Sequence, residues 1–233
     1  MLELSNISVS YGAIDAVKSV SLTAKPGVIT ALIGANGAGK SSLLKSISGL
    51  VAPEQGQVVL DGVDLANIGP HERSRMGIAH ALEGRRIFHQ HTVEENLITA
   101  WYFRNPKGNF KSAKELVYAS FPILYERRRT KAGTLSGGQQ QMLILSMATL
   151  HEPKLVLLDE PSLGLAPIVI NQIYDFIRHY AAEENRVVLV SEQMASLALK
   201  VADFGHVLRQ GELVQSGTAE QLKGAGLTNA YLG

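Results

Sequence analysis

The sequence predicts an α/β fold with an antiparallel β part at the N-terminus and a helical insertion. Three observations support this. A glycine-rich loop lies between an apolar run and a helical pattern near residue 34. A second apolar run, residues 155–158, ends in an acidic turn. Between the two, residues from about 85 to 150 show helical spacing and no convincing strand.

Length and composition set limits on the function. A chain of 233 residues can bury a core as one domain with subdomains or as two small domains. The net charge of +1 gives no broad basic field, so we expect no nucleic-acid partner. With no cysteine, thiolate catalysis and cysteine-ligated zinc are excluded. Residues 1–10 do not read as a signal peptide, and no apolar run approaches the ~20 residues of a membrane span.

The first 60 residues predict short strands. Apolar and polar residues alternate loosely over residues 2–9 and more cleanly over residues 20–24, ahead of a Pro-Gly turn. We interpret these as two half-buried antiparallel strands, and residues 57–60 as another. Tyr11 follows the first strand. Its ring is either an ordinary strand-end aromatic or a platform that stacks on a nucleotide base.

Residues 34–41 read Gly-Ala-Asn-Gly-Ala-Gly-Lys-Ser, the spacing of a phosphate-binding loop. The loop follows a predicted buried strand at 28–33 and precedes a predicted helix at 42–48, with Gly49 at its end. Glycines let backbone amides turn toward a polyphosphate, and the helix start adds positive charge. Lys40 would reach the β- and γ-phosphates and the Ser41 hydroxyl would ligate Mg²⁺. The expected phosphate-binding residues are Gly34, Asn36, Gly37, Ala38, Gly39, Lys40, Ser41 and Ser42.

The middle of the chain predicts a helical subdomain at residues 85–150. Thr92 and Glu95 have the spacing of a capping box ahead of an apolar helical pattern. A loop is expected at 105–108, and further helices at 113–125 and from 140 to about 150. Residues 1–84 and 151–233 then form the nucleotide-binding α/β core with its N-terminal antiparallel β subdomain.

After residue 150 the α/β alternation returns. The predicted elements are a strand at 155–158, a helix from Pro167, a strand at 186–190, a short helix at 194–201 and a hairpin over 207–214. The first of these strands ends at Asp159 and Glu160. This pair could be a solvated turn, but it is also what a phosphoryl-transfer site needs. Asp159 can hold Mg²⁺ opposite Ser41, and Glu160 can orient the attacking water or accept its proton.

Leu135-Ser-Gly-Gly-Gln139 forms a second anion site at a predicted helix start. Two phosphate sites in one chain suggest that two copies share each nucleotide. With these motifs the sequence resembles the ATP-binding cassette (ABC) ATPases over essentially its whole length. The resemblance implies a RecA-like core and a head-to-tail dimer in which the loop of one cassette and the signature of the other clamp ATP. The signature residues are Ser136, Gly137, Gly138 and Gln139.

The resemblance also assigns two smaller features. Tyr11 matches the base-stacking aromatic of the family. Residues 162–165 match the loop that crosses the dimer interface, with Ala166 in place of the usual aspartate. The cofactors implied are ATP and Mg²⁺.

Several segments narrow the match, namely 82–88, 92–96, 127–129, 134–142, 161–167 and 231–233. They look like the smaller ATP-binding subunit of bacterial branched-chain amino acid importers. That resemblance implies a cytoplasmic chain at the inner face of the cell membrane, paired with a second, related cassette; the isolated chain could instead form a homodimer. The pair would drive two membrane permease subunits fed by a periplasmic solute-binding protein.

Three alternatives remain open at the sequence level. The cassette could serve an importer of urea, amides or another small solute. It could be a soluble ABC ATPase acting on DNA or ribosomes, although such proteins usually carry two cassettes or a long coiled-coil insertion. It could also be a regulatory module that holds ATP without cleaving it; Glu160 argues against this alternative, whereas Glu83 and Gln193 favour it.

Three positions differ from the general ABC pattern. Glu83 stands in place of a glutamine, Gln193 in place of the switch histidine, and Met147 in place of an arginine. Glu83 could still reach Mg²⁺ or water, but as an anion it changes the charge near the γ-phosphate. Gln193 cannot titrate near neutrality. Together with Glu160, Glu83 and Gln193 are the candidate catalytic residues.

Overall fold

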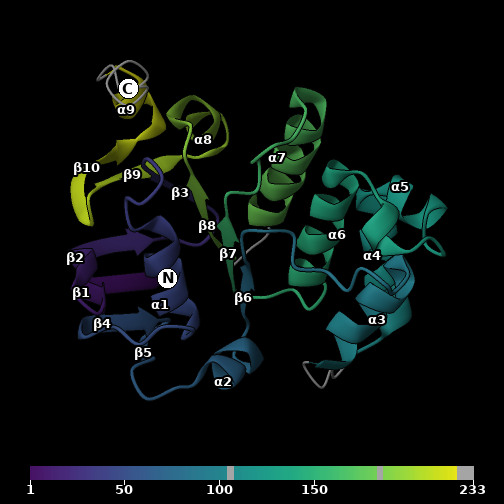
Figure 1. Cartoon of the computed structure of the whole chain (residues 1–233), viewed down its shortest axis with the longest axis horizontal. Helices are drawn as coiled ribbons and strands as arrows, with labels where there is room; N and C mark the ends of the chain where they lie inside the picture. Colours follow the sequence, from purple (N-terminus) through teal and green to yellow (C-terminus); the bar gives the residue numbers. More distant parts are fainter. Residues whose placement is uncertain (104–107, 183–185, 225–233) are drawn as a thin grey trace.

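The computed structural model describes residues 1–103, 108–182 and 186–224, and it contains two sheets (Figure 1). The antiparallel sheet has the order β2-β1-β4-β5. Its strands are β1 (Leu2–Tyr11), β2 (Ile14–Ala24), β4 (Gln55–Leu60) and β5 (Val63–Asp64). The predicted antiparallel N-terminal strands are therefore confirmed, and each is longer than its alternating pattern indicated.

The second sheet has six strands in the order β10-β9-β3-β8-β7-β6. They are β3 (Ile29–Ile33), β6 (Ile78–Ala81), β7 (Leu155–Asp159), β8 (Val187–Glu192), β9 (Phe204–Arg209) and β10 (Glu212–Thr218). All neighbours pair in parallel except β9 and β10, which form the predicted hairpin. The carboxyl ends of β3, β6, β7 and β8 consequently meet at one edge, and the chain leaves each of them through a predicted site residue.

Helices surround the six-stranded sheet. Those of the core are α1 (Lys40–Ser48), α2 (Pro70–Arg75), α7 (Pro167–Ala182), α8 (Ala195–Val201) and α9 (Ala219–Gly224). A second group lies to the right of the sheet in Figure 1 and comprises α3 (Val93–Phe103), α4 (Phe110–Ser120), α5 (Pro122–Glu126), the 3-10 helix η1 (Ala132–Thr134) and α6 (Gly137–Thr149). The boundaries at residues 85 and 150 stay a prediction.

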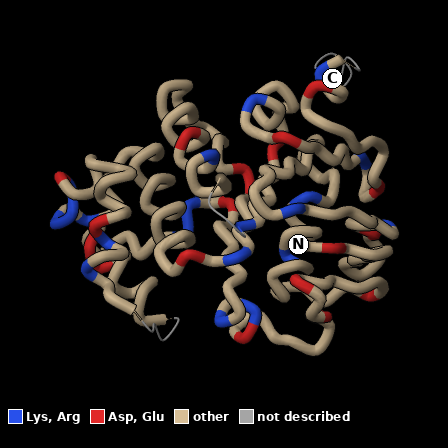
Figure 2. The backbone as a smooth tube through the Cα atoms, turned by 180° about the vertical axis from the view of Figure 1, so that it is seen from behind, with Lys and Arg blue, Asp and Glu red and all other residues tan. Residues whose placement is uncertain are grey.

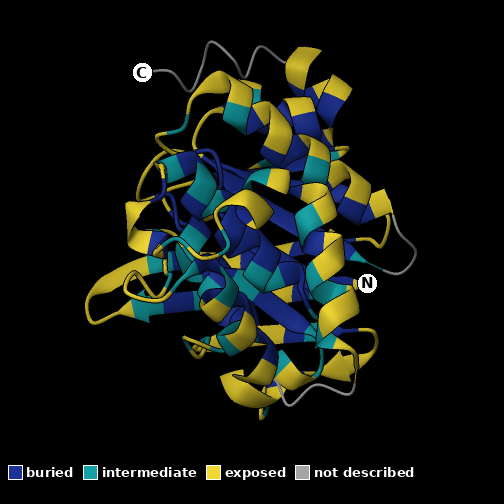
Figure 3. Cartoon of the chain, turned by 90° about the vertical axis from the view of Figure 1, so that its right-hand side faces the viewer, coloured by how far each residue is buried: buried dark blue, intermediate teal, exposed yellow. Residues whose placement is uncertain are grey.

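The apolar run of β7 is buried on both faces of the sheet. Val156 and Leu158 pack in a cluster with α7 and α8, whereas Leu155 and Leu157 pack in another with α1 and the antiparallel sheet. Because side chains alternate along a strand, a strand covered on both faces must be apolar at every position. A third cluster lies among α3, α4, α5 and α6. Figure 3 shows the buried strands inside a layer of helices with exposed outer faces.

Some predicted elements were wrong. The helix expected at 113–125 is divided at Phe121 and Pro122 into α4 and α5, because proline cannot continue the hydrogen bonding of a preceding helix. The helix expected from residue 140 begins at Gly137. Strand β6 was not predicted, since four residues carry too little pattern to identify. The loop predicted at 105–108 lies mostly outside the described residues.

Charged residues of both signs are distributed over the whole backbone (Figure 2). Among the described helices, none is both long enough and apolar enough to cross a membrane.

Helix α2 is attached to the core by one buried guanidinium. The Arg73 side chain donates hydrogen bonds to the carbonyl oxygens of Ser46 and Ile47 at the end of α1, at 2.7 and 2.9 Å. It also donates to the carbonyl oxygens of Leu65 and Ile68 at 2.6 and 2.7 Å. The last carbonyls of a helix lack partners within that helix, so Arg73 caps the helix that carries the phosphate loop.

Replacing Arg73 by alanine should lower the free energy of unfolding by about 3 kcal/mol, because three buried carbonyl oxygens and one partly buried one lose their donor. Chemical denaturation measures this change. Arg75, an exposed residue of the same helix, provides the matched control. Arg75→Ala should change the stability by less than about 0.5 kcal/mol. Equal effects of the two substitutions would contradict the capping role.

Candidate active site

The phosphate loop requires glycine at two close backbone contacts. Gly39 precedes α1 with φ of 101°, and a Cβ there would lie 2.3 Å from the Ala16 carbonyl oxygen. A Cβ on Gly34 would lie 2.5 Å from the Leu208 carbonyl oxygen. Gly37 also has positive φ, 78°, but nothing lies within 4 Å of a Cβ built there. The loop is therefore packed against neighbouring backbone at both ends and open in the middle.

Lys40 forms a buried ion pair with Glu160. Its Nζ lies 3.1 Å from Glu160 Oε1, and the two side chains are 3% and 7% exposed. The same Nζ donates hydrogen bonds to the carbonyl oxygens of Gly34 at 2.8 Å and Ala35 at 3.1 Å. Removing either charge alone would leave the other buried and uncompensated. A phosphate that binds Lys40 must compete with Glu160 for it.

Ser41 and Asp159 are in contact, as the sequence predicted for a shared metal ion. The Ser41 hydroxyl donates to Asp159 Oδ1 at 3.0 Å, and Ser191 Oγ donates to the same oxygen at 2.6 Å. Mg²⁺ prefers oxygen ligands, and it commonly takes only one or two from the protein beside water and phosphate oxygens. A hydroxyl and a carboxylate at this separation fit that preference.

The turn after β7 holds Glu160 in an unusual backbone conformation. Its φ is 48°, in the left-handed region that residues other than glycine rarely adopt. Its amide donates to both the carbonyl oxygen and the hydroxyl of Ser191, each at 3.1 Å. The neighbouring strand thus stabilises a conformation that is strained on its own.

A cavity of about 670 Å³ brings most of the predicted residues together, within the size range of small-molecule sites. Its walls include Tyr11, Asn36, Gly37, Gly39, Lys40, Ser41, Ser42, Glu83 and Glu160. Tyr11 is 46% exposed and lines this cavity, where a ligand can reach it. Gln193 lies exposed in a bend before α8 and is not among the lining residues.

The signature turn lies elsewhere in the chain. Ser136 caps α6: its Oγ accepts from the amide of Gln139 at 3.3 Å, and Gln139 Oε1 accepts from the amide of Ser136 at 3.1 Å. The amides of Gly137 and Gly138 belong to the same first turn, where the helix dipole is positive. None of residues 136–139 lines the phosphate-loop cavity. The two predicted anion sites are separate within one chain.

Comparison with known proteins identifies the family. Residues 17–163 match the ABC transporter family. The chain belongs to this family, whose nucleotide-binding cassettes are ATPases.

Its relatives are transport ATP-binding proteins. The cassette is 44% identical to BraG of Pseudomonas aeruginosa, a high-affinity branched-chain amino acid transport ATP-binding protein, over the full length of both chains. It is 36% identical to a probable branched-chain amino acid transport ATP-binding protein, LivF of Archaeoglobus fulgidus, over 95% of this chain and 94% of LivF. A solved ATP-binding subunit of an ABC transporter superposes with a TM-score of 0.85 at 29% identity, over 100% of this chain and 96% of that one. The predicted fold and family are confirmed.

Sequence reasoning missed two residues of the cassette's site. Ser191 and Glu192 end β8, and Ser191 lies opposite Asp159 in the parallel pairing of β7 with β8. The signal was indirect: if two apolar strands pair in parallel, polar residues at their ends lie beside each other. The register that aligns them could not be read from the sequence.

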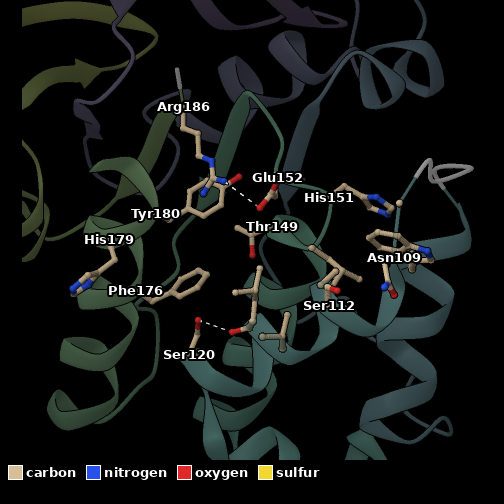
Figure 4. A pocket seen from close by; sticks show the side chains of 16 residues that line it. Asn109, Ser112, Ser120, Thr149, His151, Glu152, Phe176, His179, Tyr180 and Arg186 are labelled. Carbon is tan, nitrogen blue, oxygen red and sulfur yellow. Dashed lines mark hydrogen bonds and ion pairs between the residues drawn. The ribbon is translucent and has the colours of Figure 1, made fainter. Parts of the chain in front are cut away.

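A further cavity, of about 520 Å³, lies between α4, the end of α6, and α7 (Figure 4). On one side the Arg186 guanidinium lies 4.2 Å from the Tyr180 ring centre and 3.5 Å from a Glu152 oxygen. On another side the His151 ring stacks on Trp101 at 4.5 Å. No phosphate-loop residue lines this cavity. It separates the helical group from α7 and is distinct from the nucleotide site.

Substitution of Gly39 by alanine should reduce nucleotide affinity by more than about tenfold, since the new Cβ both clashes with Ala16 and opposes the backbone conformation. Titration with a fluorescent ATP analogue measures the loss. Gly37→Ala is the matched control: it adds the same atom at positive φ but into open space. The control should lose clearly less affinity, and an equal loss would show that the close packing at Gly39 is unimportant.

Proposed function

We propose that this cassette hydrolyses ATP to power a membrane importer of branched-chain amino acids. The chemistry is supported above all by the convergence of Lys40, Ser41, Asp159 and Glu160 at one sheet edge. The solute class is supported by the full-length similarity to BraG and the similarity to LivF.

Each residue has a role in this proposal. The loop from Gly34 to Ser42 holds the phosphates, and the Tyr11 ring stacks on the base. Ser41 and Asp159 ligate Mg²⁺, which supplies positive charge to the phosphate oxygens when bound. Lys40 exchanges Glu160 for the phosphates, and the freed carboxylate orients the attacking water and accepts its proton. Nucleotide binding would therefore release the base that hydrolysis needs.

We further propose that the signature turn completes the site of a second cassette. Its separation from this chain's own loop supports that arrangement, because none of residues 136–139 lines this chain's phosphate-loop cavity. Pseudomonas aeruginosa, the source of BraG, also has BraF, a second branched-chain amino acid transport ATP-binding protein, which is 29% identical to this chain. A heterodimer of two related cassettes is the form we favour.

An apolar groove of about 350 Å³ would receive the permease at the cytoplasmic face of the membrane. It lies between β6, the segment that follows it, α3 and α6. Phe88 and Phe103 line it and are 48% and 70% exposed, and exposed apolar side chains that gather around a groove are typical of interaction sites. Met147, which replaces an arginine of the general pattern, forms part of the wall. An apolar side chain at this position would pack against the apolar face of a short helix from a membrane subunit.

Replacing Glu160 by glutamine should abolish ATP turnover while leaving ATP binding intact, because an amide cannot accept the proton from water. The variant should accumulate as a closed dimer with bound ATP. Phosphate release and size-exclusion chromatography with ATP measure both effects. Glu220, an exposed residue of α9, supplies the control, and Glu220→Gln should hydrolyse ATP at the normal rate. Turnover by the Glu160 variant would refute the assignment of the base.

Substitution of Gln193 tests whether this residue, which replaces the switch histidine of the general pattern, acts in hydrolysis. Gln193→Ala should lower ATP turnover by at least about fivefold if the amide contacts the γ-phosphate in the closed dimer. Met194→Ala, a change at the exposed neighbouring position, is the control. Unchanged ATPase and transport in the Gln193 variant would exclude a role for Gln193 in hydrolysis.

A transport assay identifies the solute class. The complex is isolated through a tag on this chain and reconstituted in vesicles. Addition of ATP on the cassette side, with a solute-binding protein on the other, should drive accumulation of leucine, isoleucine or valine. Accumulation of urea or a short amide instead would keep the importer and overturn the solute class.

A further inference from the structure

Glu192 is a buried carboxylate to which no motif assigns a role. It ends β8 and is 3% exposed. Its Oε1 accepts hydrogen bonds from the Tyr174 hydroxyl at 2.8 Å and from the Ser162 amide at 3.2 Å. Its Oε2 accepts from the Ser162 hydroxyl at 2.8 Å. Three donors on two other elements therefore converge on one side chain.

These contacts join the parts of the active site. Tyr174 belongs to α7, and Ser162 follows Glu160 by two positions. The Glu192 carbonyl oxygen also accepts from the Gly34 amide, at 3.3 Å, at the start of the phosphate loop. Through its backbone and its side chain, Glu192 thus contacts both segments that carry the chemistry.

Burial makes the charged form of the Glu192 carboxylate unfavourable. Burial is the main cause that raises the pKa of Glu192, and the charge of Glu160 adds to it, whereas the bonds from Ser162 and Tyr174 act in the opposite direction. Burial also raises the pKa of Tyr174, so its hydroxyl stays a donor. An apolar residue would avoid this desolvation, but it would leave three buried donors without an acceptor.

The turn that Glu192 contacts needs external support. Within residues 160–165, the Leu163 amide donates to the Glu160 carbonyl oxygen and the Leu165 amide to the Ser162 carbonyl oxygen, both at 3.2 Å. Glu160 and Gly164 both have positive φ, 48° and 67°. Ser191 fixes the Glu160 amide, and Glu192 fixes Ser162 on the other side of it.

We propose that Glu192 is a positioning residue for ATP hydrolysis, which holds the 160–165 turn through Ser162 and so keeps Glu160 beside the phosphate loop. This inference rests on the proposed role of Glu160 as the base. The hydrogen bonds of the Glu192 side chain go to Ser162 and Tyr174 and to none of residues 34–42, so its loss should affect turnover much more than nucleotide binding.

Three substitutions separate the contacts. Glu192→Ala removes all three acceptor interactions. Glu192→Gln keeps all three contacts. Its amide oxygen accepts from the Tyr174 hydroxyl and the Ser162 amide, and its NH₂ group donates to the Ser162 hydroxyl, which reverses the direction of that one bond. Tyr174→Phe removes one donor and keeps the ring. Glu220→Ala, at an exposed position on α9, is the control.

Hydrogen exchange on the full chain tests the anchoring itself. The amides of residues 162–165 should exchange about tenfold faster or more in Glu192→Ala, since a charged hydrogen bond is lost. In Glu192→Gln the exchange rates of these amides should stay within about threefold of those in the unsubstituted chain. In Tyr174→Phe the rates should lie between those of Glu192→Gln and Glu192→Ala. Unchanged exchange at 162–165 in Glu192→Ala would overturn the proposal, as would a general increase throughout β7, β8 and α7.

Steady-state ATPase of the complex isolated through the tagged chain tests the consequence. In Glu192→Ala we expect kcat to fall about tenfold or more with KM for ATP within about twofold, and Glu192→Gln should restore most of kcat. A normal kcat in Glu192→Ala, or a loss that glutamine does not rescue, would overturn the positioning role. If the unsubstituted complex itself failed to hydrolyse ATP, the proposed function would fail, while hydrogen exchange would still decide the anchoring.

Discussion

The shared carboxyl edge of four parallel strands is the constraint on which the site depends. β3, β6, β7 and β8 end together, so the phosphate loop, Glu83, the Asp159-Glu160 turn and Ser191 meet although more than 150 residues separate the first from the last. The buried pair of Lys40 and Glu160 joins two of these ends directly. A buried charge is tolerated only with its partner, so the pair links the phosphate loop to Glu160, the base in our proposal. Any phosphate that binds Lys40 must alter this link, and in our proposal this couples nucleotide binding to hydrolysis.

Much of this site could be predicted because local backbone chemistry dictates it. Only glycine fits where the loop meets Ala16, and a two-sided strand must be apolar, so the phosphate loop and β7 were recognisable. Glu192 was not, because its role depends on contacts with Ser162 and Tyr174 that only the strand register and the docking of α7 create. The division of α4 from α5 at Pro122 was a local signal that the apolar pattern obscured.

The sites that we assign to the cassette do not indicate which solute the transporter carries. The nucleotide cavity, the signature turn and the apolar groove lie on different parts of the chain. In our proposal they serve ATP, a second cassette and the permease, and none of them contacts the transported solute. Met147 is one example: it forms part of the wall of the apolar groove, and it does not line the phosphate-loop cavity. The solute class therefore depends on the partners.

The most direct test is to identify those partners. A tagged chain would be recovered from gently solubilised membranes of its native host, and the co-purifying chains identified by mass spectrometry. The account predicts two integral membrane subunits and a second, related cassette. Recovery of soluble partners alone, such as ribosomal or DNA-repair proteins, would contradict the importer role and leave only the nucleotide chemistry in place.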